Sequence, residues 1–304
     1  MMKSMQSAVT GLRAQQTAMD VIANNIANSN TVGFKASSTT FSDLFYQTLN
    51  NGSEFVDPSQ VGYGAQVAGV SKNMTNSGYT STDDSTDLFI DGGGYFALAT
   101  SQDATTANYY TRVGNFTFKG GYLVDRTTGA FVMARNTDGS LSALRIDSSA
   151  GAAVTLVPQS GTAVAINDTT TTNYPNGSFA ALTGITVNQD GTVSASLGST
   201  SGKLCGPDGK PIQIALCQFQ NDGGLTQVGN NFYSASESSG PAVVGAAGTN
   251  NTTVLRTGAL ESSNVDIAKE FTNMITSQRG FQADSRVITV SDSMLEELVN
   301  LKRQ

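Results

Sequence analysis

Apolar side chains recur every seven residues near both ends of this 304-residue chain. Residues 4–30 are otherwise largely polar and carry one such repeat, which consists of Met5, Leu12, Met19 and Ile26, with Ile22 beside it. Residues 265–301 carry the second, which consists of Ile267, Met274, Phe281, Ile288 and Leu295, with Phe271 beside it. A repeat of seven predicts a helix with one narrow apolar face. Most helical stability comes from packing, so we expect the two ends to pair with each other as a coiled coil.

Short apolar segments separated by glycine turns fill much of the chain between these helices. Leu88–Ile90 and Tyr95–Leu98, for example, flank the turn Asp91–Gly94. Such spacing is typical of an all-β body. A Thr-, Ala- and Gly-rich stretch at 136–180 interrupts the pattern and indicates a small inserted β subdomain or loop.

The predicted class is therefore α+β, mainly β, with the terminal helices paired as a coiled coil and the β body discontinuous. The predicted order is an N-terminal helix (1–30), an extended connector (31–70), the first part of the β body (71–135), the small β insertion (136–180), the second part of the body (181–258) and the C-terminal helix (259–304).

The chain contains no histidine, which argues against an enzyme. Ser-His-Asp and Cys-His catalysis are excluded, and the commonest metal ligand is missing. Cys205 and Cys217 match no C-x-x-C metal pattern, so they are either two strand thiols or a disulfide between neighbouring strands. We expect no catalytic, cofactor-binding or metal-binding residue. An acidic cluster at Asp83, Asp84, Asp87 and Asp91 lacks the central Gly and final Glu of a calcium loop and favours a solvated loop.

The formal net charge of −7 argues against nucleic acid or an anionic membrane as a partner. The chain has no run of 18 apolar residues, so we do not expect it to insert into a membrane. A cleaved signal peptide is not expected either, because Gln6, Arg13 and Gln15 interrupt the N-terminal apolar run.

Four motifs resemble those of the bacterial flagellar rod and hook proteins. The first covers Asp20–Lys35 at the end of the N-terminal helix, and the second covers Gly258–Asp266 and continues to Phe281. The others, Leu88–Phe96 and Tyr110–Phe116, lie in the β body.

The resemblance implies a structural subunit that polymerises with itself into a helical tube in the bacterial flagellum, outside the cell. It also implies contacts with other axial proteins (rod, hook cap and hook–filament junction) and export by the flagellar type III apparatus without signal cleavage. The segments 285–289 and 298–303 are most similar to the hook subunit, which couples the basal body to the filament and transmits torque. The alternative is the distal rod protein, since 136–180 leaves room for only a small outer domain.

Residues outside the two apolar repeats are candidates for contacts between subunits. Local roles, such as helix capping or a solvated face, remain alternatives for each of them. The candidates are Asn24, Asn25, Asn28, Gly33, Phe34, Gln278, Arg279 and Arg286.

A secreted carbohydrate-binding or hydrolytic β protein is a more distant alternative. Carboxylates are present, but no pair of them is marked out by its neighbours as a glycosidase acid and nucleophile.

Overall fold

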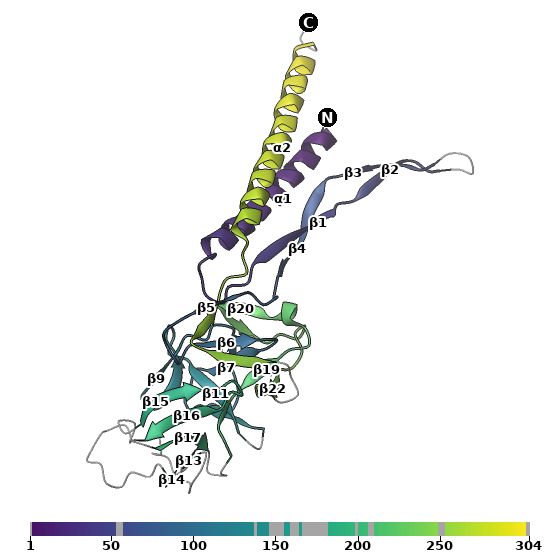
Figure 1. Ribbon diagram of the computed structural model, residues 1–304. Helices are drawn as coiled ribbons and strands as arrows, with labels where there is room; N and C mark the ends of the chain where they lie inside the picture. The colour runs from purple at the N-terminus through teal and green to yellow at the C-terminus, as the bar shows by residue number, and fades with distance from the viewer. Residues whose placement is uncertain are drawn as a thin grey trace. The chain divides into compact units, whose positions relative to one another are not determined.

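The computed structural model describes residues 2–52, 57–136, 139–145, 155–158, 164–165, 182–197, 200–205, 210–248 and 253–301. They form two compact units, the first from 1–30, 34–74 and 264–304, and the second from 31–33 and 75–263. The predicted class, mainly β with two terminal helices that pack together, is confirmed (Figure 1).

The first unit is built on helices α1 (Met2–Ala27) and α2 (Ile267–Leu301), which lie side by side (Figure 1). Strands β1 (Ser37–Asp43) and β4 (Ala65–Lys72) form an antiparallel pair that also contacts α1. Strands β2 (Tyr46–Asn50) and β3 (Ser59–Gly62) form a second antiparallel pair between them in the sequence. Helix α1 is therefore covered by both α2 and the β1–β4 pair.

The segment predicted as an extended connector is thus mostly paired β structure. Alternate residues of β1 are partly buried, which is the burial pattern of a strand with one covered face. This pairing was not predicted, because the strands are rich in Ser, Thr and Gln and the alternation of apolar and polar residues along them is weak.

The buried face of α1 differs from the predicted apolar repeat. Met5, Leu12, Met19 and Ile26 are only partly buried. The buried residues are Ala8, Ala14, Ala18, Ile22 and Asn25. The repeat predicted a single partner helix, whereas α1 has two partners, and small side chains allow both to approach its backbone.

The start of α2 is capped by Asp266, whose Oδ1 accepts hydrogen bonds from the N–H groups of Ala268 (3.0 Å) and Lys269 (3.2 Å). This satisfies helical donors that have no partner within the helix. In the predicted repeat of α2, Met274, Ile288 and Leu295 are partly buried. Ile267, Phe271 and Phe281 are exposed.

The second unit contains a large antiparallel sheet. Along its main path the strands are β20 (Thr226–Gly229), β21 (Phe232–Ser234), β8 (Tyr109–Thr111), β7 (Tyr95–Ala99), β11 (Phe131–Arg135), β10 (Tyr122–Asp125) and β9 (Phe116–Lys119). The strands off this path are β12 (Leu141–Ala143) and β18 (Gln213–Ile214), which pair with β11, and β19 (Leu216–Gln218), which pairs with β7 and with β22 (Val243–Gly245). A 3₁₀ turn, η2 (Asp222–Gly224), precedes β20.

A second sheet has the order β14 (Val164–Ala165), β13 (Thr155–Pro158), β17 (Thr200–Cys205), β16 (Val193–Leu197) and β15 (Leu182–Val187). It joins strands of the predicted insertion to strands of the predicted second part of the body. The remaining residues of 136–180 lie largely outside the described residues. Two small pairs, β5 (Tyr79–Ser81) with β24 (Ala259–Glu261) and β6 (Leu88–Asp91) with β23 (Val254–Thr257), complete the unit.

One apolar core serves both sheets of the second unit. Phe96 and Leu98 from β7 are fully buried in the same cluster as Val193 and Leu204 of the second sheet. The rings of Phe96 and Phe116 meet edge to face, with their centroids 5.0 Å apart, a favoured aromatic arrangement. The second unit therefore has the buried core that an independent domain requires.

Candidate assembly surfaces

Asn25 occupies the buried face of α1 and is 1% exposed. Its Nδ2 donates to the carbonyl of Ser37 (2.7 Å), and its Oδ1 accepts from the Ser37 N–H (3.0 Å). The side chain thus pairs with β1 as a neighbouring strand would. Asn25 was predicted as a contact between subunits, and the structure places it inside its own subunit instead. Its spacing from Ala18 and Ile22 could have indicated this, since all three lie on one helical face.

Asn264 makes a similar connection from the segment before α2. Its Oδ1 accepts from the Ala36 N–H (2.6 Å), and its Nδ2 donates to the Asn73 carbonyl (2.8 Å). Asn264 thus ties together the start of β1 and the end of β4, where Asn73 also donates its backbone N–H to the Ala36 carbonyl (2.8 Å).

Asn24 and Asn28 lie at the end of α1, with Asn24 exposed and Asn28 partly buried. The Nδ2 of Asn28 donates to the backbone carbonyl (3.0 Å) and to the Oδ1 (2.7 Å) of Asn24. The helix ends at Ala27, three residues earlier than predicted, because these asparagines satisfy its last carbonyls locally. A contact of either side chain with a second subunit stays a prediction.

Gly33 and Phe34 are both buried. Gly33 has φ +66°, and a Cβ there would lie 2.7 Å from Cγ2 of Val113. Only glycine meets both demands at low cost. These two predicted assembly residues therefore support their own chain and present no side chain at the surface.

Gln278, Arg279 and Arg286 are exposed on α2. Arg279 donates from Nη1 to Oε1 of Gln282 (3.3 Å). Their accessibility is compatible with contacts to another subunit, which stay a prediction.

Helix α2 also carries exposed apolar side chains. The seven-residue repeat had placed some of them on its buried face. Ile267, Phe271 and Ile275 follow one another at intervals of four residues near its start. A second row near its end consists of Val287, Val290, Met294, Leu298 and Leu301, all at least 43% exposed. Residues spaced by three and four share a helical face. Contiguous exposed apolar rows of this kind mark protein interaction surfaces.

The β2–β3 pair presents further exposed apolar side chains. Phe45 is 82% exposed, and Tyr46, Leu49 and Val61 are also exposed. The first unit thus has apolar surface on both its helical and its β elements.

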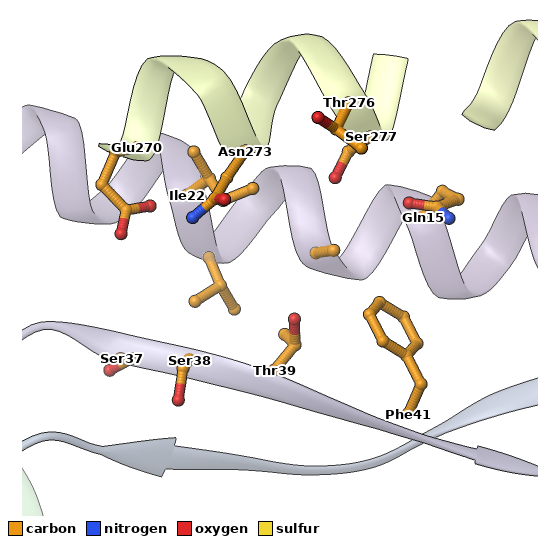
Figure 2. A pocket seen from close by; sticks show the side chains of 12 residues that line it. Gln15, Ile22, Ser37, Ser38, Thr39, Phe41, Glu270, Asn273, Thr276 and Ser277 are labelled. Carbon is orange, nitrogen blue, oxygen red and sulfur yellow. The ribbon is translucent and has the colours of Figure 1, made fainter. Parts of the chain in front are cut away.

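A cavity of about 340 Å³ lies within the first unit between α1, α2 and β1. Figure 2 shows Ser37, Ser38, Thr39 and Phe41 along β1, and Glu270, Asn273, Thr276 and Ser277 along α2. Glu270 is the single charged residue of this lining. The cavity has small hydroxyl and amide groups but no pairing of acid and base that would support catalysis.

The acidic cluster of the second unit is largely paired with arginine. Nη2 of Arg126 lies 2.9 Å from Oδ2 of Asp84, and Nη2 of Arg256 lies 2.9 Å from Oδ2 of Asp91. Within the described residues, no group of three or more His, Cys, Asp or Glu could hold a metal ion.

Cys205 and Cys217 are free and buried, so the two-thiol alternative is the one seen in the structure. Burial raises the pKa of the Cys205 thiol and raises that of Cys217 to about 12. Both groups are therefore protonated at neutral pH and poor nucleophiles. Among the described residues, no helix is long and apolar enough to cross a membrane.

Comparison with known families gives two matches, one at each end of the chain. The family described as "Flagella basal body rod protein" matches residues 5–35. The family described as "Flagellar basal body rod FlgEFG protein C-terminal" matches residues 256–301. The matches cover most of α1 and the turn after it, and all of α2 with β24 and the end of β23 before it.

Full-length relatives extend the similarity over the whole chain. The flagellar basal-body rod protein FlgG of Bacillus subtilis is 37% identical over 310 residues, covering all of both chains. The chain belongs to the flagellar rod and hook protein family. The FlgG protein of Caulobacter vibrioides is 31% identical, covering 99% of this chain and all of the relative. The flagellar hook protein FlgE of Borreliella burgdorferi is 28% identical over 445 residues, covering 99% of this chain and all of the relative.

Membership of the flagellar rod and hook family makes this chain a structural component of the flagellum. The residues that carry the family's terminal signatures have clear structural tasks here. Asn25 and Asn264 bond to residues at the ends of β1 and β4, and the Gly33 N–H donates to the Glu261 carbonyl. Exposed apolar side chains of the first unit lie in the two rows of α2 and on the β2–β3 pair.

Proposed function

We propose that this chain is the distal rod subunit of the flagellar basal body. The distal rod is a stiff tube that transmits torque. The observation that carries the proposal is length. The rod relatives align with this chain end to end over about its own length, whereas the hook relative needs 445 aligned positions. A large part of that hook alignment has no counterpart here.

Self-assembly is supported by the exposed apolar rows of α2. A solvent-facing row such as Val290, Met294 and Leu298 is costly in a monomer and favourable when covered. A contact between different surfaces of identical subunits propagates into a helical filament when it does not close into a ring. We propose that the subunit also meets other axial proteins of the rod and hook and leaves the cell through the flagellar type III export apparatus without signal cleavage.

The hook subunit is the second candidate. It is favoured by the similarity of 285–289 and 298–303 to hook proteins and by the hook relative among the matches. The two functions differ mechanically, because a rod must be straight and a hook must bend.

Electron microscopy of polymers grown from the purified full-length chain distinguishes them. Straight, unbending tubes are expected for the rod subunit, and curved or supercoiled tubes would establish the hook subunit instead. In a motile host, the gene should restore flagella to a strain lacking its rod subunit and not to one lacking its hook subunit. A chain that stays monomeric under all polymerising conditions and restores neither strain would contradict both.

A further inference from the structure

Three segments of the second unit meet at Glu261, the last residue of β24. The chain enters this unit before residue 31 and leaves it after residue 33, then enters again at residue 75 and leaves at residue 263. The backbone carbonyl of Glu261 accepts from the Gly33 N–H (2.8 Å), and its Oε1 accepts from the Ser77 N–H (3.2 Å). The Ser77 hydroxyl in turn donates to the Ser263 carbonyl (3.0 Å). Glu261 therefore bonds directly to two of the connecting segments, at Gly33 and at Ser77. Ser77 in turn bonds to the third segment at Ser263.

Arg112 supplies the opposing charge from the end of β8. Its Nη1 lies 3.6 Å from Oε2 of Glu261, and the two side chains are 2% and 1% exposed. Its Nη2 donates to the Gly92 carbonyl (3.0 Å), which also accepts from Nδ2 of Asn76 (2.8 Å). The guanidinium lies 5.4 Å from the centroid of the Tyr95 ring. Arg112 is thus held by the large sheet and its neighbouring turn.

A buried ion pair contributes little net stability compared with apolar residues of similar size, but removing one partner leaves a costly unpaired charge. The geometry suits a positioning role instead. One carboxylate oxygen binds the Ser77 N–H while the other faces Arg112, so the segment at 75–77 is fixed relative to β8. The Asp91–Arg256 pair, with both side chains about half exposed, joins β6 to β23 and makes no hydrogen bond to Gly33 or Ser77 within the described residues.

We propose that Glu261 and Arg112 are positioning residues. They anchor the segments through which the chain enters and leaves the second unit to the β sheet of that unit. In the assembled tube they hold these segments so that load passes into the body without local unfolding. The statement about load rests on the proposed function, whereas the anchor itself is a property of the single chain.

Hydrogen exchange of the full-length monomer tests the anchor. In Glu261→Met, the Ser77 amide loses its acceptor and should exchange faster, on the order of tenfold or more, because its local opening becomes easier. Amides in the core of the large sheet, such as that of Leu98, should keep their protection. The control, Asp91→Asn, breaks an exposed pair in the same unit and should leave Ser77 unchanged. Unchanged protection of the Ser77 amide in a folded Glu261→Met protein would overturn the proposal.

A second variant covers the case in which Glu261→Met, with Arg112 left unpaired, fails to fold. Arg112→Met combined with Glu261→Met removes both charges and leaves no unpaired ion in the core. It should fold, keep protection at Leu98 and lose protection at Ser77. Retained protection at Ser77 in this variant would equally overturn the anchor.

Swimming in media of rising viscosity tests the load path, in a host that depends on this chain. The double variant should assemble and then lose swimming speed at high viscosity sooner than wild type, while Asp91→Asn should not. Changed exchange with unchanged swimming would retain the anchor and overturn the load path. Failure of the wild-type gene to restore any flagella would instead contradict the proposed function.

Discussion

At the scale of single residues, asparagine side chains replace main-chain pairing where the helix meets the strands. Asn25 offers one donor and one acceptor to Ser37, and Asn264 does the same for Ala36 and Asn73. An amide can do both at once, whereas a carboxylate can only accept. This explains why asparagine occurs in the terminal signatures at positions where a simple helix cap could use Asp or Ser.

Asn25→Asp therefore should destabilise the first unit. The new carboxylate can accept from the Ser37 N–H but leaves the Ser37 carbonyl without its donor, at a cost of about 1–3 kcal/mol. Urea unfolding followed by circular dichroism measures the loss. Asn24→Asp is the matched control, because Asn24 is exposed, and equal effects of the two substitutions would contradict the role given to Asn25.

The buried phenol of Tyr233 predicts loss of stability at alkaline pH. Burial and the nearby Glu261 carboxylate raise the pKa of Tyr233 from 10.0 to about 12, and burial raises that of Cys217 from 9.0 to about 12. Between pH 9 and 12 the folded protein therefore holds more protons than the unfolded chain, so stability falls as pH rises through this window. Urea midpoints measured from pH 8 to 12 should decrease, and Tyr233→Phe should flatten part of that decrease. A midpoint that does not change with pH would contradict this assignment.

At the scale of elements, α1 shows how a second partner alters helix packing. The seven-residue repeat correctly predicted that α1 and α2 pack together. It could not reveal that β1 and β4 also cover α1, because these strands have little apolar alternation. The buried row of Ala8, Ala14 and Ala18 follows from that second contact.

Ala14→Leu tests this packing. Ala14 is 5% exposed and does not line the cavity, and overpacking such a site typically costs about 1–3 kcal/mol. Thermal unfolding of the helical signal should shift to lower temperature. Ala23→Leu, at an exposed position of the same helix, should leave it nearly unchanged. A neutral Ala14→Leu would show that α1 is not tightly covered.

The exposed row near the end of α2 predicts a variant that folds but does not assemble. Val290→Glu places a charge in the row that assembly would cover, where an unpaired charge is costly to bury. Sedimentation should find the variant monomeric under conditions in which wild type polymerises, with an unchanged circular dichroism spectrum. Thr289→Glu adds the same charge on a different side of the helix and should assemble better. Normal polymers from Val290→Glu would remove this row from the assembly surface.

At the scale of the whole molecule, the chain is divided between two units with separate interiors. Segments from both ends of the sequence build the first, and the second has its own apolar core around Phe96 and Phe116. Units of this kind can unfold as separate cooperative steps.

Calorimetry of the full-length monomer should therefore resolve two transitions. Leu98→Ala, which opens a cavity in the second unit's core, should cost about 2–5 kcal/mol and lower one transition. Ala14→Leu should lower the other. A single transition shifted by both substitutions would show that the units unfold together.

The sequence by itself determined the class of this protein: two terminal helices that pack together, a β body between them, and signatures that identify the flagellar rod and hook family. Such features are local or periodic, so they can be recognised without knowing what each segment touches. The tertiary structure alone decided the β pairing of 37–72, the second partner of α1, the internal roles of Asn25 and Gly33, and the buried Arg112–Glu261 pair. These depend on contacts between residues far apart in the chain, and only the folded backbone brings such residues within hydrogen-bonding distance.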